Sequence, residues 1–338
     1  MNAHDLLWIG FDGKDAAEVP EAPVPGAVIL FARNLDPDPL AGPARCHALI
    51  RGLQDRWGRV ATLPVALDQE GGAVSRLKTW VGPTPGLRTL WRKGGDAACA
   101  AWGGRWARGL RLLGFQVDFA PVADLWDGHP DTGLGDRCAS EDPRESAQAA
   151  GAFLHGLESA GVRGCLKHYP GLGGTTVDSH KALPELRDMG QITRNLQPFR
   201  ALAHRDRLVM VAHLKTPGTC GQPASLHRGS VAGNPWGIAG RWIPDDLEMG
   251  GCSDIPWVQR VRLALEAGHE ALLVCQTRAG IEACAAAAEN LPEALWRPAA
   301  ERFAAFRRGL PPADSGPFES GAWAAWVDEV KEEAARFL

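Results

Sequence analysis

Short runs of apolar residues, many of them β-branched, recur along the chain and alternate with longer amphipathic or alanine-rich segments. Apolar runs of about four to eight residues between polar or turn residues are typical of buried strands, and the longer segments are typical of helices. This alternation predicts repeated strand–helix units and a parallel sheet. The strand candidates, in order, are 6–11, 27–31, 64–67, 115–120, 162–166, 208–212, a weak one around Trp242 and Ile243, and 271–275.

Several of these predicted strands end in polar residues. In a (β/α)8 barrel the loops after the strands build one face, and that face carries the active site. A doubly wound open sheet would share the local rhythm, but no G-x-G-x-x-G motif follows the first strand. Eight repeats without that motif favour an α/β fold of the (β/α)8 type. The polar strand ends are Asp12, Arg33, Asn34, Asp68, Gln69, Glu70, Asp124, Lys167, His168, His213, Asp245 and Asp246.

Apolar residues at helical spacing predict helices between and after the strands. The pattern breaks at Gly309-Leu310-Pro311-Pro312, and a final amphipathic segment follows. We expect this segment, about residues 311–338, to be a C-terminal helix that packs back on the barrel. The other predicted helices are 98–113, 146–160, 281–287 and 299–306, and the apolar face of the last helix is Trp323, Trp326, Val327, Val330, Ala334 and Phe337.

The length of the chain bears on the number of domains, and its charge bears on the kind of partner. The 338 residues alone suggest two domains, but barrels commonly run this long as one unit, so we expect a single domain over residues 1–338. Apolar residues make up 45% and charged residues 22% of the chain, and the net charge of -4 is spread without long blocks of one sign. This composition is typical of a soluble globular protein and argues against a nucleic-acid partner.

The chain shows no membrane or targeting signal. No apolar run approaches the ~20 residues of a membrane span, and the start, Met1 to Asp5, has neither a basic region nor a cleavage pattern. We expect a cytoplasmic protein that is a monomer or a weak dimer. The eight cysteines form no C-x-x-C pair and no cluster with histidines, which predicts buried, reduced thiols rather than a zinc site or a disulfide framework.

The segment 166–180 places candidate chemistry at the end of a predicted strand. An apolar run ends in Lys167-His168, a glycine-rich stretch follows, and it leads to Asp178-Ser179-His180. An imidazole two residues beyond a carboxylate can share a hydrogen bond with it, which fixes the ring tautomer and raises its basicity. The pair suits proton transfer, and the glycines at 171, 173 and 174 would let the loop swing over a substrate. A surface turn with a solvated histidine is the alternative.

Eight motifs occur in order along the chain. They are Gly26-Ala-Val-Ile-Leu-Phe-Ala-Arg-Asn34, Ala66-Leu-Asp-Gln-Glu-Gly-Gly72, Phe119-Ala-Pro-Val-Ala-Asp124, Gly135-Asp-Arg137 with Asp142-Pro143, Lys167-His168-Tyr-Pro-Gly171, Asp178-Ser-His180, Ala212-His213 and Asp245-Asp-Leu247. Together they resemble glycoside hydrolase family 3, and more closely its short, single-domain β-N-acetylglucosaminidases of cell-wall recycling. The resemblance implies a (β/α)8 barrel, retaining hydrolysis of terminal β-linked N-acetylglucosamine, a small carbohydrate as the partner, and no metal or organic cofactor.

Through this resemblance, Asp245 stands where the family's nucleophile stands. A retaining mechanism needs a carboxylate that attacks the anomeric carbon and a second group that protonates the leaving oxygen and later deprotonates water. The resemblance implies that His180, paired with Asp178, is the second group. A neutral ring near pH 7 can serve as acid and base in turn. A helix N-cap is the alternative interpretation of Asp245.

Four further residues match family positions that contact the sugar. Asp68 follows a predicted buried strand, where a carboxylate is costly unless it is paired or faces a ligand. Arg137, Lys167 and His168 are donors suited to hydroxyl groups or to an acetamido oxygen. Structural ion pairs are the alternative for Arg137, Lys167 and His168.

For Gln69, Glu70 and His213, a structural role explains the residue as well as a role in sugar binding does. Gln69 and Glu70 could equally be turn residues, and Glu70 could pair with Arg76 inside the fold. A buried histidine bonded to a neighbour explains His213 as well as a family role does, so no role is assigned to it.

Three positions depart from the usual family pattern, namely Ala73 in place of Arg, Leu172 in place of His and Pro244 in place of Ser. The first two changes remove polar groups, and Pro244 fixes φ and removes one N–H beside Asp245. We therefore expect altered sugar contacts or loop closure. A glycosidase or phosphorylase for another β-linked sugar and a non-catalytic sugar-binding protein are the alternatives.

The glycine segment 171–174 meets a run of residues that favour extended structure. We expect this segment to be displaced or poorly ordered in the free protein, with His180 far from Asp245 until a sugar fills the pocket.

Overall fold

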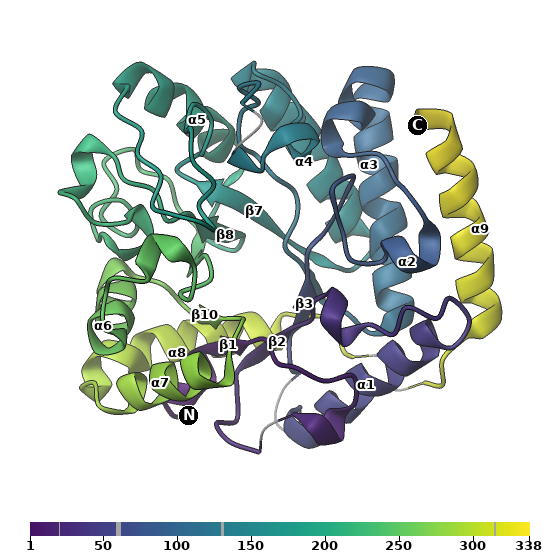
Figure 1. Cartoon of the computed structure of the whole chain (residues 1–338), viewed down its shortest axis with the longest axis horizontal. Coiled ribbons are helices and arrows are strands. Elements are labelled where there is room, and N and C mark those ends of the chain that lie inside the picture. Colours follow the sequence, from purple (N-terminus) through teal and green to yellow (C-terminus); the bar gives the residue numbers. More distant parts are fainter. Residues whose placement is uncertain (20, 59–61, 130–131, 314–315) are drawn as a thin grey trace.

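The computed structural model describes residues 1–19, 21–58, 62–129, 132–313 and 316–338. Within these ranges, eight parallel strands form one sheet in the order β10-β1-β2-β3-β6-β7-β8-β9 (Figure 1). Every strand candidate coincides with one of them, and the weak candidate is β9. The bounds are β1 Leu7–Ile9, β2 Ala27–Ile29, β3 Val65–Leu67, β6 Val117–Asp118, β7 Arg163–Tyr169, β8 Leu208–Val211, β9 Arg241–Pro244 and β10 Leu272–Val274.

The two edges of this sheet meet. The backbone N–H of Glu270 donates to Trp242 O at 2.8 Å, and that of Leu247 donates to Leu273 O at 2.9 Å. These bonds bring β9 and β10 together, so the sheet is nearly closed into a barrel. The closure confirms the predicted (β/α)8 fold, and the open, doubly wound alternative is wrong.

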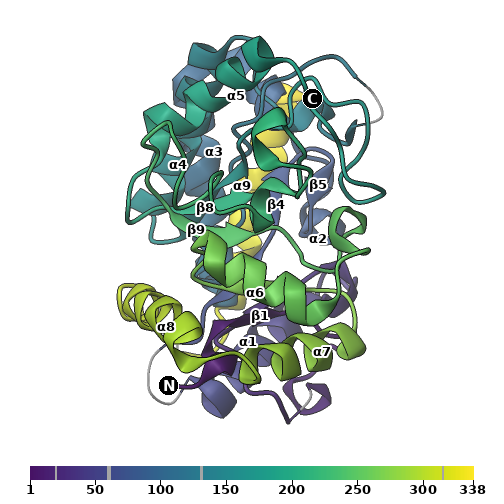
Figure 2. The same ribbon diagram turned by 90° about the vertical axis from the view of Figure 1, so that its left-hand side faces the viewer.

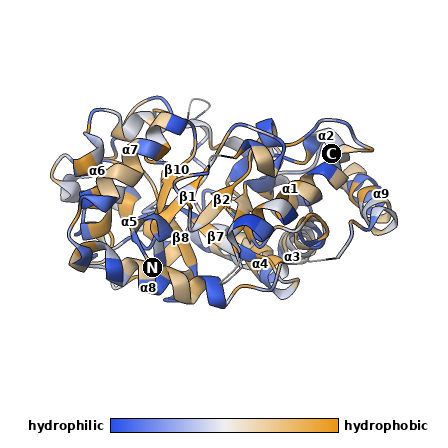
Figure 3. Ribbon diagram, turned by 90° about the horizontal axis from the view of Figure 1, so that it is seen from below, coloured by the Kyte–Doolittle hydropathy of each residue, from blue (hydrophilic) through white to orange (hydrophobic). Residues whose placement is uncertain are grey.

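The barrel interior is a packed apolar core. Side chains alternate between the two faces of a strand, so Trp8 points into the barrel while Leu7 and Ile9 join the outer core. The Trp8 and Phe119 rings lie 5.1 Å apart inside the barrel, and Figure 3 shows the apolar strands between the helices. Each large apolar side chain contributes about 1.5–3 kcal/mol on burial. This packing holds the strand ends, and therefore the first residues of the loops, in fixed positions.

Helices surround the strands (Figure 2). Asp142 caps the N-terminus of α4, because its side chain accepts hydrogen bonds from the backbone N–H groups of Arg144 and Glu145 at 2.8 and 3.1 Å. The longest helix, α3, starts at Leu87 rather than at residue 98 and is kinked at Gly95 (φ 58°, ψ -150°). The helices are α1 Gly42–Trp57, α2 Lys78–Val81, α3 Leu87–Leu113, α4 Pro143–Ser159, α5 Met189–Leu202, α6 Trp257–Ala267, α7 Arg278–Glu289, α8 Glu293–Arg308 and α9 Ser320–Phe337.

The C-terminal helix α9 packs on α3 at the outside of the barrel (Figure 1). Trp326 donates from Nε1 to Arg105 O at 2.8 Å, and its ring occupies the space where a side chain on Gly109 would lie. The predicted apolar face is therefore confirmed as a packing face. The helix begins at Ser320; residues 311–313 and 316–319 precede it without helical structure, and 314–315 lie outside the described residues.

The structure also bears on the expectations for membrane spans and for the cysteines. In the described part of the chain, no helix is long and apolar enough to cross a bilayer. Seven of the eight cysteines are buried, as predicted, and Cys220 is exposed.

Candidate active site

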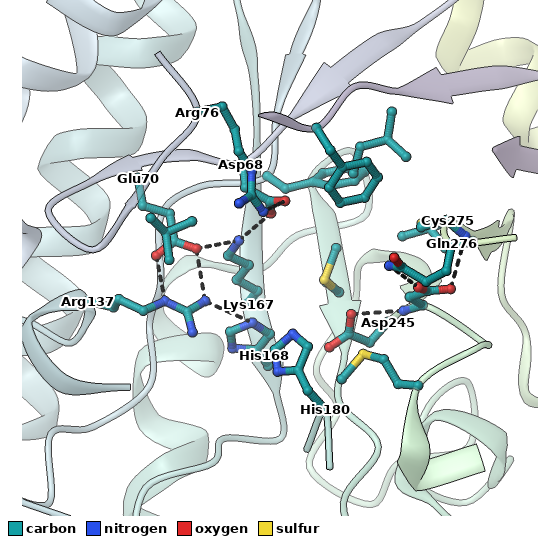
Figure 4. Close-up of a pocket in the computed structure, with 18 residues that line it drawn as sticks. Asp68, Glu70, Arg76, Arg137, Lys167, His168, His180, Asp245, Cys275 and Gln276 are labelled. Atoms are coloured by element: carbon teal, nitrogen blue, oxygen red, sulfur yellow. Dashed lines mark hydrogen bonds and ion pairs between the residues drawn. The ribbon is translucent and has the colours of Figure 1, made fainter. Parts of the chain in front are cut away.

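A cavity opens at the carboxyl ends of the barrel strands and holds about 640 Å³ of empty space, its mouth included. Six of the seven candidate site residues line it (Figure 4). The seventh, Asp178, is hydrogen-bonded to His180. The side chains come from segments far apart in the sequence that the barrel brings together. Those that line the cavity are Ile29, Phe31, Asp68, Glu70, Val74, Arg76, Phe119, Arg137, Lys167, His168, His180, Met210, Asp245, Asp246, Met249, Leu273, Cys275 and Gln276.

Lys167 on β7 is the centre of a buried charge cluster. Its Nζ lies 2.8 Å from Asp68 Oδ1 and 2.6 Å from Glu70 Oε1, and only 2% of its side chain is exposed. Burial opposes the charged form of Lys167, but the two carboxylates outweigh this effect and raise its pKa. The same contacts outweigh burial at Asp68 and Glu70 and lower the pKa of both carboxyl groups. All three groups are therefore charged near neutral pH.

Two arginines complete the cluster. Arg137 holds Glu70 with both arms of its guanidinium, at 2.8 and 2.9 Å, and Arg76 donates to Asp68 at 3.0 Å. The predicted pairing of Glu70 with Arg76 is therefore wrong. The reason is the hairpin β4 (Gln69–Gly71) and β5 (Val74–Ser75), whose alternating side chains turn Glu70 toward Arg137. Gln69 holds this hairpin together through Ser75 Oγ at 2.9 Å.

Asp124 fixes the ring of His168. The carboxylate lies 2.7 Å from His168 Nδ1, so we assign the Nδ1 proton to this hydrogen bond. Nε2 then remains as an acceptor on the cavity side, 3.5 Å from Arg137 Nη2. Asp124 also accepts the backbone N–H groups of His168 at 3.1 Å and Leu172 at 2.7 Å. The sequence interpretation gave Asp124 no role, although a carboxylate at a buried strand end was a usable signal.

Asp245 follows β9 and points into the cavity (Figure 4). Its backbone N–H continues the ladder to Val211 O at 2.9 Å, and its Oδ1 accepts the N–H of Asp246 at 2.8 Å. The next α-helix, α6, begins only at Trp257. The interpretation of Asp245 as the N-cap of a helix is therefore wrong, and its side chain is available to a ligand.

His180 and Asp178 form the predicted pair. His180 Nδ1 lies 2.7 Å from Asp178 Oδ1, which also accepts the His180 backbone N–H at 2.9 Å. Although partial burial acts in the opposite direction, these hydrogen bonds lower the pKa of Asp178. The His180 side chain is 69% exposed and lines the same cavity as Asp245. A proton-transfer group and a carboxylate therefore face one space.

The glycine segment is anchored rather than displaced. Asn195 Nδ2 donates to the carbonyl groups of Gly171 and Gly173 at 3.0 and 2.8 Å, and Leu172 is buried. The expectation of a displaced segment is therefore wrong for residues 171–174 in this structure, whereas a large separation of His180 from Asp245 in the free protein stays a prediction. Asn195 lies on α5, a helix that the apolar pattern did not predict, so its contacts with the glycines were not foreseen.

Comparisons with known proteins decide the family. Residues 6–305 match the model of the glycosyl hydrolase family 3 N-terminal domain. The chain belongs to glycosyl hydrolase family 3. It is 33% identical to a β-hexosaminidase of Pseudomonas aeruginosa over 291 residues, 84% of each chain. The family that the motifs resemble is thereby confirmed.

Solved structures of family 3 proteins share the fold. A family 3 β-N-acetylglucosaminidase from Paenibacillus sp. str. FPU-7 superposes with a TM-score of 0.83 at 27% identity, over 98% of this chain and 68% of that one. NagZ from Neisseria gonorrhoeae in complex with N-trifluoroacetyl-D-glucosamine gives 0.78 at 26% identity, over 98% of both chains. The barrel described above is thus the family 3 barrel.

The three departures from the usual family 3 pattern lie outside the cavity lining. Leu172 is part of a buried apolar cluster, and Ala73 lies in the turn of the β4–β5 hairpin. Pro244 is the last residue of β9, paired with Val211. None of the three side chains lines the cavity, and altered sugar contacts or loop closure stay a prediction.

His213 lies next to the site but does not line the cavity. It is fully buried, with Nδ1 2.6 Å from Ser225 Oγ and Nε2 2.8 Å from Asp246 O. These contacts agree with the interpretation of His213 as a buried histidine bonded to its neighbours. Among the described residues, no group of three or more His, Cys, Asp or Glu side chains is arranged to hold a metal ion.

Proposed function

We propose that this family 3 protein is a retaining β-N-acetylglucosaminidase that removes terminal β-linked N-acetylglucosamine. The observation that carries the proposal is the placement of Asp245 and the Asp178–His180 pair around one cavity. Similarity to proteins named β-hexosaminidase and β-N-acetylglucosaminidase supports the choice of sugar. So does the similarity to NagZ, which was solved with N-trifluoroacetyl-D-glucosamine.

In the proposed complex, the buried charge cluster binds the sugar. Asp68 and Glu70 present acceptors to hydroxyl groups, while Lys167 and Arg137 present donors. Because these charges are already paired at 2.6–2.9 Å, the groups are fixed before the sugar arrives and need little reorganisation. His168 adds an acceptor at Nε2, whose orientation Asp124 sets.

In the proposed first step, Asp245 attacks the anomeric carbon and forms a glycosyl ester. His180 donates a proton from Nε2 to the leaving oxygen, while Nδ1 keeps its hydrogen bond to Asp178. In the second step, water attacks the same carbon from the vacated side and gives a proton to Nε2 as the ester bond to Asp245 breaks. The sugar leaves with its original configuration, and His180 regains its proton.

The choice of His180 as the acid–base group is supported by the state of the other carboxyl groups in the cavity. Lys167, Arg76 and Arg137 hold Asp68 and Glu70 in the ionised form, with lowered pKa values, so neither can supply a proton near neutral pH. Burial raises the pKa of Asp246 to about 6, but its two oxygens are already occupied by hydrogen bonds from Glu248, Cys275 and Gln276. His180 is exposed to the cavity and keeps Nε2 free for transfer.

We further propose peptidoglycan-derived muropeptides as the natural substrates, in cell-wall recycling inside the cell. This part rests on the resemblance of the sequence motifs to the single-domain family members of cell-wall recycling. It predicts turnover of a soluble muropeptide that carries a terminal N-acetylglucosamine, with N-acetylglucosamine as the released sugar.

One assay tests the activity directly. An aryl β-N-acetylglucosaminide should be hydrolysed much faster than the matching β-glucoside, and proton NMR should show the β-anomer of the product first. An α-anomer first would exclude retention. Sugar binding without any turnover would instead favour the non-catalytic alternative, and a requirement for phosphate would favour a phosphorylase.

The nucleophile has a separate test. Asp245→Ala should lower turnover by at least about 10³-fold. The free energy of unfolding should change by no more than about 1 kcal/mol, because among the described residues the carboxylate has one hydrogen-bond partner, the adjacent Asp246 N–H. A fluorinated sugar that forms a slowly hydrolysed ester should label the peptide that contains Asp245. Labelling of another peptide would remove Asp245 from this role.

A further inference from the structure

The tip of the loop after β7 carries the Asp178–His180 pair. We define the tip as residues 176–182. Its hydrogen bonds stay within it: the N–H groups of Lys181 and Ala182 donate to Asp178 O at 2.9 and 3.2 Å, and His180 bonds only to Asp178. All residues from 132 to 313 are described, and no hydrogen bond joins the tip to another segment there. Within the described residues, contacts other than hydrogen bonds to neighbouring segments therefore set its position.

The two ends of the tip are anchored. On one side, the N–H of Gly174 donates to Asp127 Oδ2 at 2.7 Å, and Thr175 Oγ1 donates to Leu172 O at 2.8 Å. On the other side, the N–H of Leu186 donates to Lys215 O at 2.9 Å. The loop can thus pivot between fixed ends, and a small shift of the tip would carry His180 with it.

Gly250 is the close contact beneath the tip. A Cβ atom on Gly250 would lie 2.7 Å from Lys181 O, 2.9 Å from Lys181 C and 3.1 Å from His180 O. Real side chains do not approach backbone atoms that closely, so any residue other than glycine at 250 would force the tip away. The contact at Gly133 is less tight, because a Cβ atom there would lie 3.5 Å from Asp178 Oδ2.

The segment that carries Gly250 is held firmly to the barrel. It follows β9 and begins with Asp245. His213 binds the carbonyl of Asp246 at 2.8 Å, the N–H of Met249 donates to that carbonyl at 3.0 Å, and Arg260 donates to Leu247 O. One rigid segment therefore carries both the carboxylate that faces the cavity and the surface against which the tip rests.

We infer that Gly250 is a positioning residue that sets the place of His180 relative to Asp245. Its missing side chain lets the backbone of His180 and Lys181 settle on the segment after β9, where His180 faces the shared cavity. This inference rests on the proposed acid–base function of His180. It adds that a van der Waals contact between the loop after β7 and the segment after β9 sets the distance between His180 and Asp245.

The tip has space into which a substitution could push it. A second cavity, about 1010 Å³ with its open side included, borders Lys181, Ala182 and Leu183 and has Gly250 in its wall. Gly250 itself is only half-buried, and its φ lies outside the left-handed region. An alanine is therefore compatible with its backbone, and the tip can yield without unfolding the barrel.

Gly250→Ala tests the inference, with Gly218→Ala as the matched control. Gly218 lies in the exposed loop after β8, where an added Cβ would meet only Thr216 Oγ1 at 4.0 Å. With natural, poor leaving groups, Gly250→Ala should lower kcat about 10- to 100-fold, because misplacement by about 1 Å can cost this much. KM should stay within about twofold, since the charge cluster is untouched. An activated aryl leaving group, which needs little protonation, should lose much less.

Hydrogen exchange gives a readout that does not depend on turnover. Peptides covering residues 176–182 should exchange faster in Gly250→Ala than in the wild type or Gly218→Ala, at an unchanged melting temperature. Unchanged exchange and unchanged rates would overturn the inference, as would an equal loss of kcat for all leaving groups. If the wild type has no activity and exchange still rises in Gly250→Ala, the contact stands and the proposed glycosidase function fails.

Discussion

Asp245 and Asp246, the two adjacent aspartates after β9, differ in their exposure and in their hydrogen-bond partners. Asp245 points into the cavity, whereas Asp246 is 6% exposed and accepts hydrogen bonds from the backbone N–H of Cys275 at 3.1 Å and from Gln276 Nε2 at 2.9 Å. Burial is the main reason that the pKa of Asp246 is raised to about 6. Its hydrogen bonds brace the segment that carries Asp245.

The raised pKa of Asp246 predicts a pH-dependent stability. The folded protein binds this proton more tightly than the unfolded chain, so the free energy of unfolding should fall as the pH rises from about 4 to about 6, then level off. A shift of about two units corresponds to about 3 kcal/mol. Asp246→Asn keeps the shape and removes the buried charge, so it should stabilise the protein at pH 7 by up to that amount and by nearly nothing at pH 4.

Urea unfolding at the two pH values checks this prediction, with the exposed Asp96→Asn as control. The control should be neutral at both values. A stability difference for Asp246→Asn that is the same at pH 4 and pH 7 would show that burial of the charge is not the cause.

At the scale of single elements, the loop after β7 shows which contacts a sequence pattern can predict and which it cannot. The Asp178–His180 pair is local, so its spacing of two residues predicts its hydrogen bond, and the structure has it at 2.7 Å. The glycines were misjudged, because their constraint is Asn195, which lies on another element. Asp124 was missed for the same reason, since His168 and Leu172 are 44 and 48 residues away from it in the chain.

The pair itself makes a prediction about leaving groups. Asp178→Asn removes the carboxylate that orients His180 and supports its positive charge, so the ring should become less basic, less often protonated and less well placed. We expect a loss of about 10²-fold in kcat/KM for substrates with poor leaving groups and a much smaller loss for activated aryl glycosides. A series of aryl substrates with graded leaving groups measures the difference.

Glu185→Gln is a suitable control for that series, because Glu185 lies in the same loop and its carboxylate forms an ion pair with the exposed Arg187. It should leave all rates close to those of the wild type. If Asp178→Asn slows every substrate equally, His180 does not act as the acid.

At the scale of the whole molecule, the strands were predictable and the closure of the barrel was not. A buried strand shows as an apolar run, and even the weak run at Trp242 and Ile243 is β9. Closure depends on hydrogen bonds from Glu270 and Leu247 to residues on the other edge, and no local pattern reports such a pairing. The same limit applies to the charge cluster, since Lys167 lies 99 residues from Asp68 in the chain.

The C-terminal helix provides a test of how separate stability and chemistry are in this molecule. Trp326 is 4% exposed and packs against Trp323 in a tilted arrangement, with ring centroids 4.7 Å apart, on the outer side of α3. It lies away from the cavity lining. Trp326→Ala should therefore lower the free energy of unfolding by about 3–5 kcal/mol, while kcat and KM measured well below the melting temperature stay within about twofold of the wild type.

Lys331→Ala, on the exposed face of the same helix, should change neither the free energy of unfolding nor the rates. Urea unfolding and steady-state rates on the same preparations check both expectations. A loss of kcat in folded Trp326→Ala would instead mean that α9, through α3, supports the geometry of the cavity as well as the stability of the barrel.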